Sequence, residues 1–135
     1  MNRASKLFSY AHKSKSRMLK KLIHIFLRIV YSCDLPLRGT IGTGLVLEHN
    51  GLGVVISQEA IIGNDCTVYQ HVTIGGRNGY PTIGNRCIIY PNSVIVGAIS
   101  IGDNCVIGAN SFVNIDVDSN IIVAGNPAHI IRYKN

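Results

Sequence analysis

The sequence predicts a mainly β protein, a parallel β-helix of about four coils preceded by an N-terminal amphipathic α-helix. Three observations lead to this prediction. Aliphatic residues recur every six positions over most of the chain, glycine often follows them directly, and the first 33 residues have a different, basic composition. The chain has 135 residues, the size of one domain, and its 47% hydrophobic content suffices for a buried core.

The first 33 residues are expected to be helical. Residues 5–32 contain no Gly or Pro, and Ser5 is a candidate N-cap. Spacings of three and four predict one apolar face, made of Leu19, Leu22, Ile23, Phe26, Ile29 and Val30. We expect this face either to pack on the rest of the protein or a neighbouring subunit, or to lie on an anionic membrane surface. The apolar run is too short to cross a bilayer, and no signal-peptide cleavage site follows it.

Charge divides the chain into a basic leader, residues 1–33, and a body, residues 34–135. The net charge is +6, yet the leader holds eight of the 13 Lys and Arg residues and no acid. The body holds the other five and all 7 acids, so it is slightly negative. Nucleic acid is not a predicted partner, because interleaved aromatic residues and a known motif are both missing.

The body contains a six-residue repeat. Thirteen aliphatic residues mark it: Leu35, Ile41, Leu47, Ile56, Ile62, Val68, Ile74, Ile83, Ile89, Ile95, Ile101, Ile107 and Val113. A period of six fits neither a helix nor a two-residue alternation, and it indicates short strands joined by tight corners, three hexads to a triangular coil. Ile41, Ile62, Ile83 and Ile101 should then stack in one column, and Leu47, Val68, Ile89 and Ile107 in another.

The period slips by three residues at two places. The first slip contains residues 49–53, and the second contains residues 75–80. Extra residues in a solenoid must bulge outward, and such loops often carry function. We therefore expect the chemistry at these two bulges.

All four cysteines take the same place in the hexad, two residues before the aliphatic position. This pattern predicts an inward ladder of small apolar side chains at Cys66, Cys87 and Cys105, with Cys33 in the same role. Metal-binding spacing such as CxxC is missing, so no metal site is predicted.

These hexads, for example Ile62-Gly63-Asn64-Asp65-Cys66-Thr67, and the closing segment 123–128 (VAGNPA) resemble those of the hexapeptide-repeat acyltransferases. Residues 34–131 are similar to the serine acetyltransferase branch, which includes exopolysaccharide O-acetyltransferases. The matching segments are residues 34–36, 40–44, 47–49 and 72–76. The resemblance implies a left-handed parallel β-helix, acetyl-CoA as co-substrate without a metal, and a homotrimer with active sites between subunits.

The resemblance implies that His49 is the general base and that Asp34, fifteen residues earlier, orients it. Imidazole has a suitable intrinsic pKa for removing the acceptor hydroxyl proton, and a carboxylate would fix its tautomer. His49 as an exposed loop residue and Asp34 as a cap of the first coil are the alternatives. A backbone N–H of the second bulge is the expected oxyanion donor.

Further residues are implied for the two substrates. The CoA-binding residues are expected to be Gly75, Gly76, Asn92, Ala109, Ala124, Gly125, Arg132 and Lys134. Arg132 and Lys134 would meet the CoA phosphates, or are solvated charges of the tail. The acceptor-binding residues are expected to be Glu48, His71 and Tyr80, although His71 could face a subunit interface instead.

Two departures from the serine acetyltransferases bear on the acceptor. Those enzymes have a larger N-terminal helical domain, and they carry an Arg-His pair where this chain has Gly79-Tyr80; Glu48 also replaces an Asp. Without that cationic clamp we expect a neutral acceptor, a sugar hydroxyl of surface polysaccharide or a glycan precursor. Serine O-acetylation, a non-catalytic trimeric scaffold and a metal β-helix of the γ-carbonic-anhydrase type are the alternatives. We expect a cytoplasmic protein, with peripheral membrane contact through residues 1–33.

Overall fold

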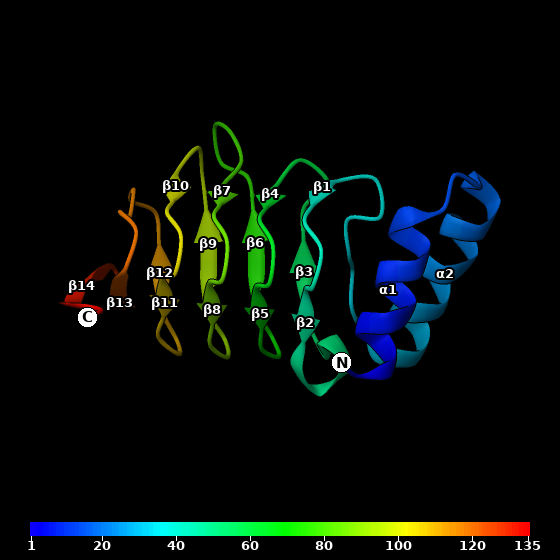
Figure 1. Ribbon diagram of the computed structural model, residues 1–135, viewed down its shortest axis with the longest axis horizontal. Helices are drawn as coiled ribbons and strands as arrows, with labels where there is room; N and C mark the ends of the chain where they lie inside the picture. The colour runs from blue at the N-terminus through cyan, green and yellow to red at the C-terminus, as the bar shows by residue number, and fades with distance from the viewer.

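A computed structural model describes residues 1–135 as an elongated left-handed parallel β-helix with two helices across its N-terminal end (Figure 1). Three sheets form the faces of the coil. The first face contains β1 (Thr40–Ile41), β4 (Ile61–Ile62), β7 (Thr82–Ile83) and β10 (Ser100–Ile101). The second face contains β2 (Val46–Leu47), β5 (Thr67–Val68), β8 (Ile88–Ile89), β11 (Val106–Ile107), β13 (Ile121–Gly125) and β14 (Ala128–Tyr133). The third face contains β3 (Val55–Ile56), β6 (Thr73–Gly75), β9 (Val94–Val96) and β12 (Phe112–Val113).

The strand register confirms the predicted columns. On the first face Ile41 pairs with Ile62, Ile62 with Ile83, and Ile83 with Ile101, all in parallel. The second face stacks Leu47, Val68, Ile89 and Ile107 in the same way. These side chains point inward and are buried, while their strand neighbours are partly or fully exposed. The six-residue period therefore fills the interior with one aliphatic side chain per face and coil.

The cysteines are free and buried, which confirms the prediction that they belong to the core. Each thiol of the ladder also donates to a carbonyl of the next coil at 3.1 Å: Cys66 to Gly84, Cys87 to Gly102, and Cys105 to Asp118. Burial raises the pKa of Cys105, and it raises that of Cys33 to about 11. The thiols of the ladder therefore link neighbouring coils, and burial makes Cys33 and Cys105 poor nucleophiles at neutral pH.

The corner between the first and second faces is held by a polar ladder. Asn64, Asn85 and Asp103 each use a side-chain oxygen to accept a backbone N–H of the preceding coil, at 2.7–2.9 Å. Ser119 continues the ladder with its hydroxyl, which accepts from the Asp103 N–H at 2.8 Å. Side chains thus satisfy backbone groups that the short strands leave unpaired.

The leader forms two helices, α1 (Arg3–Lys13) and α2 (Arg17–Tyr31), where the sequence predicts one. The break lies between them because Ser14 Oγ accepts from the Ser16 N–H at 3.1 Å, and Ser16 Oγ caps α2 by accepting from Leu19 N–H at 3.2 Å. The predicted N-cap at Ser5 is wrong. Asn2 caps α1, with its side-chain oxygen 3.0 Å from the Ser5 nitrogen.

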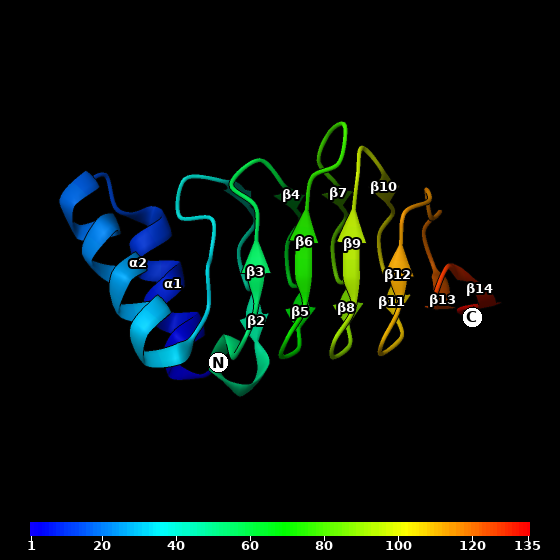
Figure 2. The same cartoon turned by 180° about the vertical axis from the view of Figure 1, so that it is seen from behind.

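The two helices cover the open end of the first coil. The side chains of Ala4, Phe8 and Ala11 are buried, and α1 lies against β2 and the first bulge. Both views show α2 as the outermost element at this end, far from the C-terminal strands (Figures 1 and 2). Neither helix has the length and apolar composition that a membrane crossing requires. At the opposite end, β14 pairs with β13 in antiparallel fashion and ends the parallel stack.

Candidate active site

The first bulge lies at the corner between the second and third faces, in a short 3-10 segment, η1 (Glu48–Gly51). His49 and Asn50 both adopt left-handed backbone conformations, with φ of 52° and 55°. Such a conformation turns the chain sharply outward and is uncommon for a residue with a side chain. His49 is exposed, so its imidazole is accessible to a bound molecule. Glu48 beside it is half-buried.

The N-terminus of α1 anchors this bulge on both sides of His49. The Leu47 N–H donates to Ser5 Oγ at 2.8 Å, and the Asn2 side-chain amide donates to the Leu47 carbonyl. After His49, the Asn50 side-chain oxygen accepts from the Ala4 N–H at 3.1 Å. Three hydrogen bonds therefore hold the backbone that carries the imidazole.

Asp34 lies at the same corner as His49, but its carboxylate contacts α2. Its backbone N–H donates to the Val54 carbonyl, directly after the first bulge, at 2.8 Å. The carboxylate oxygens lie 3.3 Å from Arg28 Nη1 and 3.5 Å from His24 Nε2. No hydrogen bond or ion pair joins Asp34 to His49, so the structure brings the two residues to one corner without joining their side chains.

His71 occupies the equivalent corner one coil further along. Its N–H donates to the Leu52 carbonyl at 2.8 Å, and its ring covers Gly53, where a Cβ atom would lie only 2.0 Å from His71 Nδ1. His71 therefore packs directly on the first bulge. Asn92 and Ala109 follow at this corner on the next two coils, and both are exposed.

The predicted CoA-binding residues fall into three groups. Asn92 and Ala109 continue from His49 and His71 along the corner between the second and third faces, and Ala124 and Gly125 lie at the end of β13 that approaches it. Gly75 and Gly76 lie at the other edge of the third face. Arg132 and Lys134 lie toward the far end of the β13–β14 hairpin, where Lys134 Nζ contacts Asn104 Oδ1 at 2.6 Å. The structure thus groups the first set with His49 and separates the two cations from it.

The second bulge, residues 75–80, projects at the corner between the third and first faces (Figure 2). The Tyr80 ring folds over Gly76, where a Cβ atom would lie 2.4 Å from the ring. Arg77 is exposed and is the one cation of this bulge. Arg77, Asn78 and Asn114 line a cavity of about 240 Å³ with apolar residues of β9 and β12. The two bulges of one chain therefore lie at different corners of the coil.

The sequence predictions miss the contacts of two sets of residues at the site. Asn2, Ser5 and Asn50 anchor the first bulge, but contacts across more than forty residues leave no local signal. The sequence does contain a signal for Arg77, because it is the single charged residue within the second slip of the repeat.

Residues 80–114 match the family described as bacterial transferase hexapeptide (six repeats). Over 125 residues the chain is 33% identical to the serine acetyltransferase of Helicobacter pylori, a match covering 89% of this chain and 72% of that protein. The chain belongs to the serine acetyltransferase family. The family is one of acetyl-CoA-dependent acyltransferases, as the hexads imply.

Solved structures of serine acetyltransferases have the same fold along almost the whole chain. The crystal structure of the Neisseria gonorrhoeae serine acetyltransferase is 30% identical, with a TM-score of 0.86 over 98% of this chain and 53% of that chain. A serine acetyltransferase in complex with CoA is 28% identical, with a TM-score of 0.83 over 95% of this chain and 55% of that one. This family member thus spans about half the length of those solved chains, and its helices are included in the likeness.

Proposed function

We propose that this chain transfers the acetyl group of acetyl-CoA to an acceptor hydroxyl, with His49 as the general base. The observation that carries the proposal is the placement of His49. It is an exposed imidazole on a left-handed turn whose flanks are held by three hydrogen bonds. A rigid, solvent-accessible base is what hydroxyl activation requires.

The proposed reaction proceeds by direct attack. The imidazole of His49 accepts the hydroxyl proton as the acceptor oxygen bonds to the thioester carbonyl carbon. A backbone N–H of the second bulge stabilises the oxyanion of the tetrahedral intermediate. When the carbon–sulfur bond breaks, the His49 imidazolium returns the proton to the thiolate, so the products are an O-acetyl ester and CoA. No cysteine is needed, in agreement with the buried thiols.

Asp34 is proposed to orient His49 when substrates are bound. Its backbone already lies beside the first bulge, and its carboxylate is 36% exposed, which leaves room for a change of rotamer. In the new rotamer the Asp34 carboxylate would leave Arg28 and His24 and contact the His49 imidazole. A carboxylate in that position stabilises the protonated base during the reaction.

The complete site is proposed to lie between subunits of a homotrimer. His49 and the second bulge occupy opposite edges of the third face, so one chain does not bring them together. Face-to-face neighbours would place the second bulge of one chain beside His49 of the next. The exposed corner with Asn92, Ala109 and Gly125 is the proposed path for pantetheine, because its small and polar side chains leave it open.

L-serine is the acceptor that we propose first. The names of the relatives support it over the sugar predicted from the sequence. Arg77 supplies a cation for the serine carboxylate, two residues before the Gly79-Tyr80 pair that lacks one. A sugar hydroxyl is the second candidate, and the observation in its favour is that Gly79-Tyr80 pair, which gives the bulge an exposed aromatic ring in place of a cation.

A free-thiol assay distinguishes these acceptors. The full chain is supplied with acetyl-CoA and either L-serine or a panel of sugars, and the release of CoA is compared with acceptor-free hydrolysis. Release that depends on L-serine is the expected result. Release with sugars alone would favour the second candidate, and no acceptor-dependent release with either class would overturn the proposed function.

A further inference from the structure

Helix α2 carries three parallel stripes, and one of them is an exposed apolar surface. Leu19, Ile23 and Leu27 form the inward stripe, and Ile23 and Leu27 are buried. The single face predicted from the sequence is thus divided in the structure. A second apolar stripe points to solvent, made of Met18, Leu22, Ile25, Phe26, Ile29 and Val30, which are 44–76% exposed. A contiguous apolar surface of this kind marks an interaction site.

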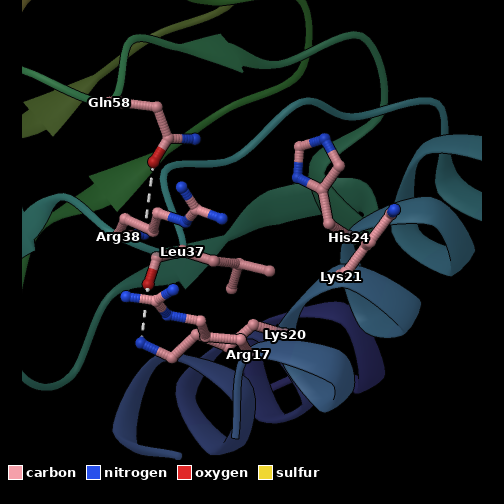
Figure 3. A pocket seen from close by; sticks show the side chains of 7 residues that line it. All are labelled: Arg17, Lys20, Lys21, His24, Leu37, Arg38 and Gln58. Atoms are coloured by element: carbon pink, nitrogen blue, oxygen red, sulfur yellow. Dashed lines mark hydrogen bonds between the residues drawn. The ribbon is translucent and has the colours of Figure 1, made fainter. Parts of the chain in front are cut away.

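A basic stripe runs beside the exposed apolar stripe. Arg17, Lys21, His24 and Arg28 each precede a residue of the apolar row by one position, which places them about 100° around the helix. The first three, with Lys20, Leu37, Arg38 and Gln58, line a cavity of about 280 Å³ between α2 and the first coil. Figure 3 shows these side chains gathered from the helix, from the loop before β1 and, at Gln58, from the turn between β3 and β4.

The cavity has no acidic side chain. Lys20 Nζ donates to the Leu37 carbonyl at 3.2 Å, and the Arg38 N–H donates to Gln58 Oε1 at 3.2 Å (Figure 3). Asp34 contacts His24 and Arg28. Arg17, Lys20, Lys21 and Arg38 therefore form no ion pair within the chain.

We propose that α2 binds the surface of an anionic lipid bilayer. The apolar stripe would enter the boundary between headgroups and acyl chains, and Arg17 and Lys21 would meet lipid phosphates beside it. Charge complementarity favours this occupant over a second copy of the chain. Residues 1–33 carry eight cations and no acid, so apposing two such surfaces would bring like charges together.

The position of α2 suits this role. It is the outermost element at one end of the elongated molecule, so a flat surface can reach it without contacting the coils (Figures 1 and 2). The row from Met18 to Ile29 extends for roughly 16 Å along the helix, enough to lie flat and too short to cross a bilayer.

Flotation with vesicles tests the proposal. The full chain is mixed with vesicles of phosphatidylcholine, alone or with one quarter phosphatidylglycerol, at low and high salt. We expect the chain to float with the anionic vesicles at low salt, to float less at high salt, and to stay behind with neutral vesicles. Equal behaviour with both kinds of vesicle, or no flotation at all, would overturn the proposal.

Two double variants separate the apolar and basic contributions. Leu22→Ser with Ile29→Ser changes exposed side chains, and Arg17→Glu with Lys21→Glu reverses two unpaired cations. Each should lower the vesicle-bound fraction by about tenfold or more. Ile131→Ser and Arg86→Glu, exposed positions on the coils, are matched controls that should float like the unaltered chain. A loss in the controls equal to that in the α2 variants would also overturn it.

Two further measurements identify other occupants. If the apolar variant changes the molecular mass in light scattering while vesicle binding is unaltered, the stripe joins copies of the chain and the proposal is wrong. If inorganic pyrophosphate raises the melting temperature through Arg17 and Lys21 while anionic vesicles do not bind, the cavity takes a soluble anion and the proposal is again wrong. The inference is independent of acetyl transfer, so an inactive His49 variant should float normally.

Discussion

The two bulges of the coil have the same origin but differ in how firmly they are held. Each arises where the six-residue period slips by three residues. The first is fixed by three hydrogen bonds from the start of α1. Apart from the Gly75 carbonyl, which accepts from the Gly97 N–H of the next coil at 3.3 Å, the second is held by its own residues, through the hydrogen bond from the Arg77 N–H to the Gly79 carbonyl at 2.9 Å and the Tyr80 ring over Gly76. In the proposed function His49 needs one fixed position to act as the base, whereas the second bulge can vary in sequence without disturbing the coil.

The largest effect is expected from His49→Asn. Asparagine tolerates the left-handed backbone at this position but cannot serve as the base, so kcat/KM for acetyl transfer should fall by about 10²–10⁴-fold. Steady-state kinetics measure the loss, and the free energy of unfolding should stay within about 0.5 kcal/mol of the original. Activity within a few fold of the original chain would show that the first bulge is not the catalytic one.

A smaller effect on two properties is expected from Ser5→Ala. This change leaves the buried Leu47 N–H without its acceptor, which should lower the free energy of unfolding by about 1–3 kcal/mol. Because the same bond positions His49, kcat should also fall, by roughly tenfold. Denaturant unfolding and kinetics measure both. Ser9→Ala in the same helix is the matched control, since the Ser9 hydroxyl makes no hydrogen bond, and equal effects in both variants would contradict the anchoring role.

At the second bulge, Arg77→Ala should act on substrate binding alone. Loss of one charge-assisted contact predicts a KM for L-serine about tenfold higher, with kcat and stability nearly unchanged. Arg86→Ala, another exposed arginine on the coils, is the comparison. If Arg77→Ala leaves the KM for L-serine unaltered, the cation does not bind the serine carboxylate, and the sugar acceptor gains support.

The smallest effect concerns pH and the docking of α1. His12 packs on Phe8, and burial, followed by the charge of Lys20, lowers its pKa below 6.5. The unfolded chain therefore takes up a proton first as the pH falls, so stability should decline from about pH 6.5 downward. Comparing unfolding at neutral and mildly acidic pH with that of His12→Gln isolates the effect. A pH dependence that survives in His12→Gln would assign it to other groups.

Much of the fold was predictable because each six-residue repeat places one aliphatic side chain inward and so sets how the coils stack. Every inward aliphatic of the columns and every cysteine of the ladder is where the period places it. The leader was predictable only in part. Its apolar residues indicate a helix, but the break between Lys13 and Arg17 depends on side-chain hydrogen bonds of two serines, and the period does not reveal which apolar residues face the coil.

The candidate site was likewise predictable from the sequence only in part. His49 and Asp34 are candidates because of the family resemblance, and the slip in the repeat identifies both bulges. The partners of the Asp34 carboxylate, Arg28 and His24, depend on how α2 packs against the first coil. Likewise, Arg132 and Lys134 follow the closing segment in the chain, but the antiparallel β14 carries them away from the line of His49, Asn92 and Ala109.

The amino-acid sequence by itself determined the coil, its register and the two places where chemistry can project. A six-residue period admits one stacking, since shifting any strand by one residue would turn its aliphatic side chain to solvent. Tertiary structure alone decided that the start of α1 holds the bulge that carries His49, that the two bulges occupy different corners, and that one apolar stripe of α2 stays exposed. Those outcomes depend on contacts between segments far apart in the chain, and no periodicity encodes them.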